Sequence, residues 1–245
     1  MRASYYDETR EQIDGLWDGL GMRKIGVIYQ DDAFGKAVLD GVKAALEKHH
    51  ATPAALGTFA RNSLDVDPGM KEVLSKNPQA IIVVGPYAPV AEVVKHAHAA
   101  GSYPTFLTVS FVGTEEFIKQ AGKDAEGTII TQVVPPYDRT DFPTVALYRE
   151  CLKRYYADAP PSFASLEGFV DAMVLVEGLK RAGKDLTREK LITAIESIHR
   201  QDLGLGSGFL LDYGPTDHKG FSRIYPTVVR GGKPVIFTDW KNIQK

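Results

Sequence analysis

The chain has 245 residues and a formal net charge of −2, and 44% of its residues are hydrophobic. These values are typical of a globular protein with one large domain or two small ones and argue against intrinsic disorder. A nearly neutral chain without a long basic tract lacks the surface of a nucleic-acid-binding protein, and no apolar stretch approaches the roughly 20 residues that span a bilayer. The single cysteine, Cys151, excludes an internal disulfide. The polar segment 1–12 indicates that the chain as given has no signal peptide.

The first half of the chain alternates between short β-branched runs and amphipathic segments. A leading helix is predicted at 5–21. Strands are predicted at 24–30, 54–60, 80–86, 104–110 and 127–134, and further helices at 34–50, 67–77, 87–101 and 114–121. Asp67 is the predicted N-cap of its helix, with Pro68 at the first helical position. Strand–helix alternation produces parallel strands with right-handed crossovers, so a doubly wound α/β layer is predicted over about 10–134.

The second half of the chain is predicted to contain three helices followed by β structure. The helices are expected at 141–158, 162–183 and 187–198, with Thr187 as an N-cap. The β structure follows residue 202 and contains a hairpin turn at Gly231-Gly232. No strand-like run separates the three helices. Their apolar faces therefore fold back on the first layer or cover a sheet that the chain does not contain.

The carboxyl ends of the predicted parallel strands carry aromatic and polar side chains. Ligands of open α/β sheets bind beyond this edge. The residues that follow the first, third, fourth and fifth strands are Gln30, Asp31, Asp32 and Phe34; Gly85, Pro86 and Tyr87; Ser110 and Phe111; and Gln132 and the run to Tyr137. Such an edge suits a small organic ligand held by ring faces and a few hydrogen bonds. Asp31 or Asp32 could equally cap the next helix, with Phe34 as a staple residue. Tyr87 and Phe111 could equally be ordinary rim residues.

Other kinds of site find less support in the sequence. A phospho-acceptor receiver domain needs an Asp after the third strand and a Lys after the fifth, where this chain has Gly85-Pro86 and Gln132. His96 and His98 point to different faces of a helix, which argues against a metal pair. Neither a G-x-S-x-G nor an H-E-x-x-H motif occurs. We therefore predict no cofactor, no metal and no catalytic residue.

Six segments together carry a family resemblance that covers nearly the whole chain. They are RASYYDET, GVIYQDDAFGKAVLDGVKAALEK, VVGPYAPVAEVVKHAHAAG, FLTVSFVG, TQVVPPY and SLEGFVDAMVLVEGLKRAGKDLTREKLITAIE. They resemble type I periplasmic binding proteins of ABC transporters, specifically the branched-chain amino acid (Leu/Ile/Val) binding group. The resemblance implies two α/β lobes joined by three crossing strands, with a ligand held between them by hinge closure. It implies that 10–134, completed by 203–240, form lobe 2. Residues 135–202 are then the helical remainder of a lobe 1 whose sheet is absent.

The resemblance also implies roles for individual residues. Phe34 and Tyr87 match aromatic positions that line the ligand cleft. Ser110, followed by Phe111, stands where the family often has an acid that holds the ligand's ammonium group. A neutral hydroxyl cannot neutralise a buried ammonium, so we expect a carboxylate, an aromatic acid or an amide rather than a simple α-amino acid. The remaining candidates for the binding site are Asp32, Gln132, Phe163 and Ser165.

The function implied by the resemblance is non-catalytic binding of a small organic solute. The complete protein would lie in the periplasm and deliver the solute to the permease of an ABC importer. A ligand-sensing domain of a signalling receptor is the alternative. A small-molecule enzyme is less favoured, since the edge offers mainly Asp31 and Asp32 as titratable groups. A homodimer through the exposed lobe 1 helices is a further expected partner, whereas nucleic acid is not.

Overall fold

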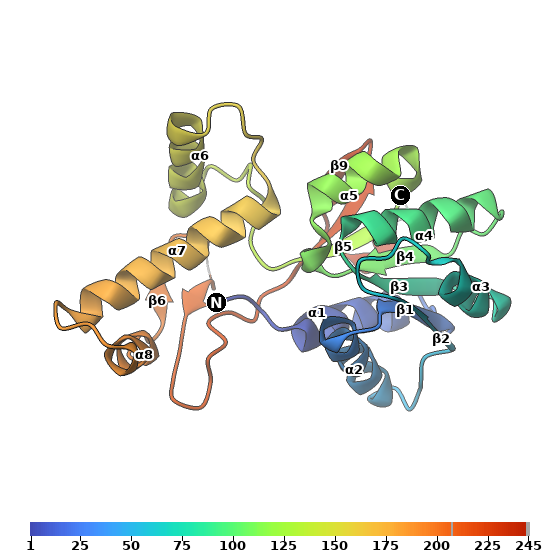
Figure 1. Ribbon diagram of the computed structural model, residues 1–245, viewed down its shortest axis with the longest axis horizontal. Coiled ribbons are helices and arrows are strands. Elements are labelled where there is room, and N and C mark those ends of the chain that lie inside the picture. Colours follow the sequence, from blue (N-terminus) through green and yellow to red (C-terminus); the bar gives the residue numbers. More distant parts are fainter. Residues whose placement is uncertain (207, 244–245) are drawn as a thin grey trace. The chain divides into compact units, whose positions relative to one another are not determined.

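The computed structural model describes residues 1–206 and 208–243, and it divides into two compact units (Figure 1). Unit 1 comprises Met1–Ser4 and Val133–Arg223. Unit 2 comprises Tyr5–Gln132 and residues 224–243. The chain therefore passes between the units three times, after Ser4, Gln132 and Arg223.

Unit 2 is built on a seven-stranded sheet in the order β2-β1-β3-β4-β5-β8-β9. The strands are β1 (Ile25–Gln30), β2 (Ala55–Phe59), β3 (Ala80–Val84), β4 (Thr105–Thr108), β5 (Ile129–Gln132), β8 (Tyr225–Arg230) and β9 (Lys233–Ile236). The first five strands in this order are parallel, and β8 and β9 are added antiparallel. The predicted doubly wound parallel sheet is confirmed, with an antiparallel hairpin at one edge.

Helices cover both faces of this sheet, as Figure 1 shows. The helices α1 (Tyr5–Asp14) and α2 (Ala33–Glu47) pack on one face, and α3 (Asp67–Ser75), α4 (Tyr87–Ala99) and α5 (Thr114–Ala121) pack on the other. The central strand β3 is buried along its whole length and supplies both cores. Ile81 and Val83 face the α3–α5 side, and Ile82 and Val84 face the α1–α2 side, as the two-residue period of a strand requires.

Several local predictions are confirmed, and one cap assignment is wrong. The hairpin between β8 and β9 turns at Gly231 and Gly232, which have φ values of 55° and 71°. Thr187 caps α8 (Arg188–Glu196) by accepting a hydrogen bond from the Lys190 amide. The N-cap of α3 is Val66 rather than Asp67, which lies inside the first turn. Its carboxylate is free to contact α4 because it does not cap its own helix.

Unit 1 contains the three helices predicted for the second half of the chain. They are α6 (Pro143–Tyr155), α7 (Phe163–Ala182) and α8, with a short antiparallel pair of β6 (Gln201–Asp202) and β7 (Leu210–Leu211). α7 and α8 approach closely because Gly178 has no side chain: a Cβ atom there would lie 2.7 Å from Cγ1 of Ile195. Residues 203–206 and 208–223 pack within this unit, whereas the sequence predicts that 203–240 complete the α/β lobe. The β6–β7 pairing holds them there.

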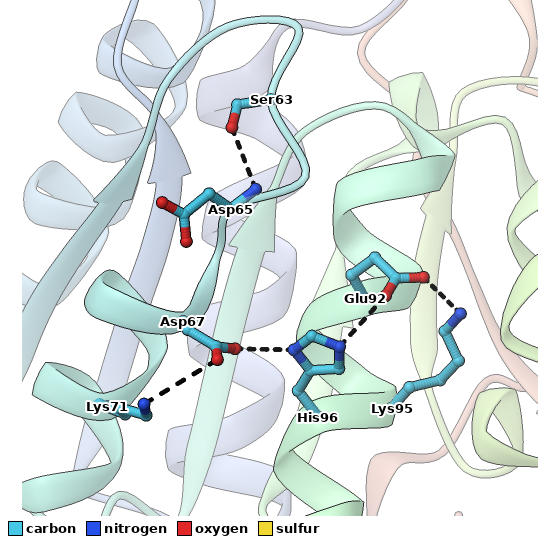
Figure 2. Close-up of polar contacts among 7 residues, drawn as sticks. All are labelled: Ser63, Asp65, Asp67, Lys71, Glu92, Lys95 and His96. Carbon is cyan, nitrogen blue, oxygen red and sulfur yellow. Dashed lines mark hydrogen bonds and ion pairs between the residues drawn. The ribbon is translucent and has the colours of Figure 1, made fainter.

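Asp67 links α3 to α4 at the surface of unit 2 (Figure 2). Its Oδ1 lies 2.7 Å from Nδ1 of His96, and Nε2 of the same imidazole lies 3.2 Å from Oε2 of Glu92. Lys71 approaches the other Asp67 oxygen at 3.9 Å. The hydrogen bond with His96 is the largest cause that lowers the pKa of Asp67 below its usual value. The carboxylate therefore stabilises the folded state in its ionised form.

We expect Asp67→Asn to lower stability near neutral pH and to have little effect in acid. Because the pKa of Asp67 is lower in the folded chain than in the unfolded chain, its contribution is present above about pH 4 and is lost as the pH falls through the folded-state value. Urea midpoints of the wild-type protein and the variant should differ near neutral pH and converge in acid. Asp65→Asn is the control, because it removes a carboxylate two positions before Asp67 and keeps the His96 contact. A constant difference at every pH would contradict this assignment.

Candidate functional site

The carboxyl ends of β1, β3 and β4 lie next to one another in the sheet and bring together the predicted aromatic residues. Phe34 stands in the first turn of α2, which follows β1, and Phe111 lies in the short 3-10 helix η2 (Ser110–Val112), which follows β4. Their ring centroids are 4.9 Å apart, and the ring of Tyr5 from α1 lies 5.4 Å from Phe34. Phe111 is 55% exposed. The edge therefore presents a ring face that a ligand can contact.

Tyr87 adds a further exposed ring to the same edge. It is the first residue of α4 and is 39% exposed. A Cβ atom added to Gly113 would lie 3.5 Å from its Cδ1 atom, which places the ring beside the turn that carries Ser110 and Phe111. We use the name aromatic edge for Tyr5, Phe34, Tyr87 and Phe111.

Asp32 serves the backbone at the start of α2. It is the N-cap residue, and its Oδ1 accepts a hydrogen bond of 3.0 Å from the Gly35 amide. The side chain of Gln30 donates to its Oδ2 at 2.5 Å. Partial burial raises the pKa of Asp32, but these hydrogen bonds outweigh burial, so the pKa lies below its usual value. The capping alternative is therefore confirmed for Asp32, which fixes the first turn of α2 and with it Phe34.

A fully buried carboxylate lies directly behind Ser110. Glu8 of α1 accepts hydrogen bonds from the Ser110 amide at 2.8 Å, from the Ser110 hydroxyl at 2.9 Å and from the Thr131 hydroxyl at 2.6 Å. Gln12, one helical turn later, donates to the Thr108 carbonyl at 2.8 Å and to Thr131 at 3.1 Å. Helix α1 therefore places a carboxyl group behind Ser110 that the sequence argument did not include. The expectation of a carboxylate, an aromatic acid or an amide rather than a simple α-amino acid stays a prediction.

The three other candidates lie in different surroundings. Gln132 is buried rather than displayed at the edge, and its Nε2 donates to the hydroxyls of Thr114 at 2.9 Å and Thr227 at 3.3 Å. In unit 1, Phe163 is buried against Tyr137, with ring centroids 5.0 Å apart. Ser165 forms the capping box of α7 with Ser162. The binding roles of these three residues stay predictions.

The sequence does not predict that Tyr5 and Glu8 belong to this site. A signal for Glu8 exists in hindsight: Glu8, Gln12 and Leu16 follow one another at intervals of four, which puts two polar groups on the same face as a buried leucine. Polar residues on the apolar face of a helix indicate buried partners. The partners themselves, Ser110 and Thr131, are more than a hundred positions away in the sequence.

The described part of the chain contains neither a group of metal ligands nor a membrane-spanning helix. Within residues 1–206 and 208–243, no group of three His, Cys, Asp or Glu side chains is arranged to hold a metal ion. None of the helices described is long and apolar enough to cross a membrane. A cavity of about 600 Å³ in unit 2 lies at the other end of the strands, against Thr105, Phe106 and Ile129. It is separate from the aromatic edge.

Comparison with known proteins decides the family. A family model described as periplasmic binding protein matches residues 1–233. The chain belongs to the periplasmic binding protein family. A solved structure of a possible leucine/isoleucine/valine-binding protein from Rhodopirellula baltica SH 1 is 31% identical with a TM-score of 0.94, and the match covers 100% of this chain and 67% of that one. This periplasmic binding protein thus has the type I fold that the resemblance implies.

More distant relatives show how widely the family extends. The Leu/Ile/Val-binding protein homolog 8 of Brucella abortus (strain 2308) is 24% identical over 223 residues, which are 85% of this chain and 53% of that protein. A fatty acid ABC transporter substrate-binding protein from Thermomonospora curvata is 21% identical, with a TM-score of 0.82 over 98% of this chain and 63% of that one. At this identity the likeness shows the fold alone. The chain spans about half the length of the curated relatives it matches.

Proposed function

We propose that this periplasmic binding protein binds a small organic solute at the aromatic edge, without catalysis, for delivery to an ABC importer. The observation that carries the proposal is the exposed Phe111 ring, which packs on Phe34 beside the Ser110 hydroxyl. Ring faces supply contact area at little cost in conformational entropy, and a hydroxyl orients the ligand. The names of the relatives, which include Leu/Ile/Val-binding proteins, support a small organic solute as the ligand.

The same edge argues for binding rather than reaction. The family is one of solute-binding proteins. An enzyme would use Asp31 and Asp32 as the titratable groups of the edge. Asp31 instead forms an ion pair with Lys36 at 2.9 Å, and Asp32 caps α2. Asp31 is thus engaged in a surface ion pair and Asp32 in capping a helix. These structural roles support a non-catalytic function.

A thermal-unfolding screen tests the binding proposal. We expect one class among branched-chain amino acids, aliphatic acids, aromatic acids and amides to raise the melting temperature by several degrees, since a ligand at about 100 times its Kd adds about 2.7 kcal/mol. Phe111→Ala is the matched variant, because it removes an exposed ring. It should weaken the ligand-induced shift and leave the melting temperature of the free protein nearly unchanged. A screen in which no compound shifts the protein would contradict the proposal.

We also propose the partners and the compartment. The family is periplasmic, and we place this protein there, with an ABC permease as the partner of the complete protein. A second copy of the chain is a further proposed partner, because α7 exposes Leu175 and Val176, each 48% exposed, and α8 exposes Ile192. Apolar side chains grouped at a surface favour association. Light scattering of the purified chain checks this second proposal, and a monomer at every concentration would contradict it.

A further inference from the structure

The cavity of about 600 Å³ in unit 2 lies at the end of the strands opposite to the aromatic edge. Its volume is within the range of small-molecule sites. The strands β4 and β5 begin at this cavity, and β8, which runs antiparallel to β5, ends at it. Every residue that lines the cavity belongs to unit 2, so this unit alone forms it.

Two exposed side chains of opposite charge line the cavity. Arg230 is the last residue of β8, and Glu126 lies shortly before β5. Oε1 of Glu126 accepts a hydrogen bond of 3.2 Å from the amide of Gly231, the residue that follows Arg230. Arg230 donates through Nη2 to the carbonyl of Ile243. Within the described chain neither charge forms an ion pair, so both stay available to a ligand.

An imidazole ring and a phenol ring also line the cavity. The rings of His98, from α4, and Tyr103 are stacked with their centroids 4.8 Å apart, and Tyr103 is 72% exposed. Nδ1 of His98 lies 2.9 Å from Oδ1 of Asp124. Because an ionised carboxylate only accepts hydrogen bonds, Nδ1 donates this one, and Nε2 of the neutral ring is then an acceptor. No side chain or amide of the described residues donates to this Nε2.

We propose that this cavity is a second binding site, which takes a small zwitterion that carries a ring. A purely anionic ligand would face Glu126 as well as Arg230, and a purely cationic one would face Arg230 as well as Glu126, so each meets a like charge. A carboxylate and an ammonium group in one molecule match both side chains through charge-assisted hydrogen bonds. The exposed ring of Tyr103 provides a surface for the ring of the ligand. This site goes beyond the proposed function, since it shares no residue with the aromatic edge.

Three probes with one carbon skeleton test the proposal by NMR titration of the full ¹⁵N-labelled chain. L-phenylalanine has both charges, 3-phenylpropanoate lacks the ammonium group, and 2-phenylethylamine lacks the carboxylate. The amide signals of Gly127 and Gly231 report on the cavity, and that of Phe111 reports on the aromatic edge. We expect L-phenylalanine to shift the two cavity signals with an affinity at least about tenfold higher than either other probe, because each of these loses a charge-assisted hydrogen bond.

Two variants assign the charges of the ligand to their partners. In Arg230→Gln the preference for L-phenylalanine over 2-phenylethylamine should fall towards one, because the carboxylate has lost its partner. In Glu126→Gln the preference over 3-phenylpropanoate should fall in the same way. A residue that served only to stabilise the fold would change the affinity for all three probes equally. Lys233→Gln is the matched control, because it removes a cation from the same hairpin and does not line the cavity.

Three results would overturn the proposal of a second site. They are cavity signals that no probe shifts at up to about 10 mM, which fills a site of millimolar affinity; equal affinities of the three probes; and variants that keep the wild-type ratios. The Phe111 signal is read in the same titrations. Binding at the aromatic edge is therefore recorded separately, and either site can fail without the other.

Discussion

Replacing Gly35 by alanine is expected to lower the free energy of unfolding of unit 2 by about 3 kcal/mol, at the upper end of the usual range for overpacking. Gly35 lies in the first turn of α2, which packs against the end of β1. A Cβ atom added there would lie 1.9 Å from the carbonyl oxygen of Gln30 and 2.9 Å from its carbonyl carbon. The clash is with the main chain, so no side-chain rotation relieves it. The start of α2 must move away from the sheet and carry Phe34 with it.

Urea unfolding followed by tryptophan fluorescence measures this effect in the correct part of the molecule. The chain has two tryptophans, Trp17 and Trp240, and both lie in unit 2. The control is Gly168→Ala, followed by circular dichroism, because no heavy atom lies within 4 Å of the methyl group added in α7. Helix propensity alone favours this control change by about 1 kcal/mol. A Gly35→Ala protein as stable as the wild type would show that α2 does not pack against Gln30 as described.

Phe117→Ala is the second change with a large expected effect, a loss of about 4 kcal/mol. Phe117 lies on α5 and is fully buried in the core formed with α3, α4 and the sheet. Removing the ring forfeits its transfer free energy and leaves a cavity that the surrounding strands and helices fill only in part. The same fluorescence measurement applies, because the whole core belongs to unit 2.

Phe111→Ala is the matched control for this second prediction. It removes the same ring from a residue that lies six positions earlier and is mostly exposed. Its effect on unfolding should stay within about 0.5 kcal/mol, whereas its effect on ligand affinity should be large. Similar losses of stability in both variants would contradict the assignment of Phe117 to the core and of Phe111 to the exposed edge.

The sequence predicts the sheet of unit 2 well because its signals are local. β3 is a continuous apolar run, and α2 has apolar residues at helical spacing, so both are recognisable within a short window. The positions of Phe34, Tyr87 and Phe111 then follow from the rule that the carboxyl ends of parallel strands share one edge. The cap of α3 is missed by one position, since the helix already begins at Asp67 and Val66 precedes it.

What the sequence does not predict depends on contacts between distant residues. Glu8 and Ser110 are 102 positions apart. The sequence around either residue therefore contains no pattern that predicts their contact. Gln132 ends a strand and could point to either face, and only the positions of Thr114 and Thr227 determine that it is buried. Such a contact places the carboxyl group of Glu8 behind Ser110. The ligand class inferred from local residues did not take this group into account, and it stays a prediction.

The interleaved path of the chain has a consequence for isolating unit 2 as an autonomous domain. A gene fragment that ended at Gln132 would lack β8 and β9 and would expose the hydrogen-bonding edge of β5, which favours aggregation. However, Gln132 and Tyr225 face each other in an antiparallel pair, with β5 ending where β8 begins. A tight hairpin of a few residues suffices to connect two such strand ends. An excised domain can therefore keep all seven strands in a single chain if this turn replaces the whole segment from 133 to 223.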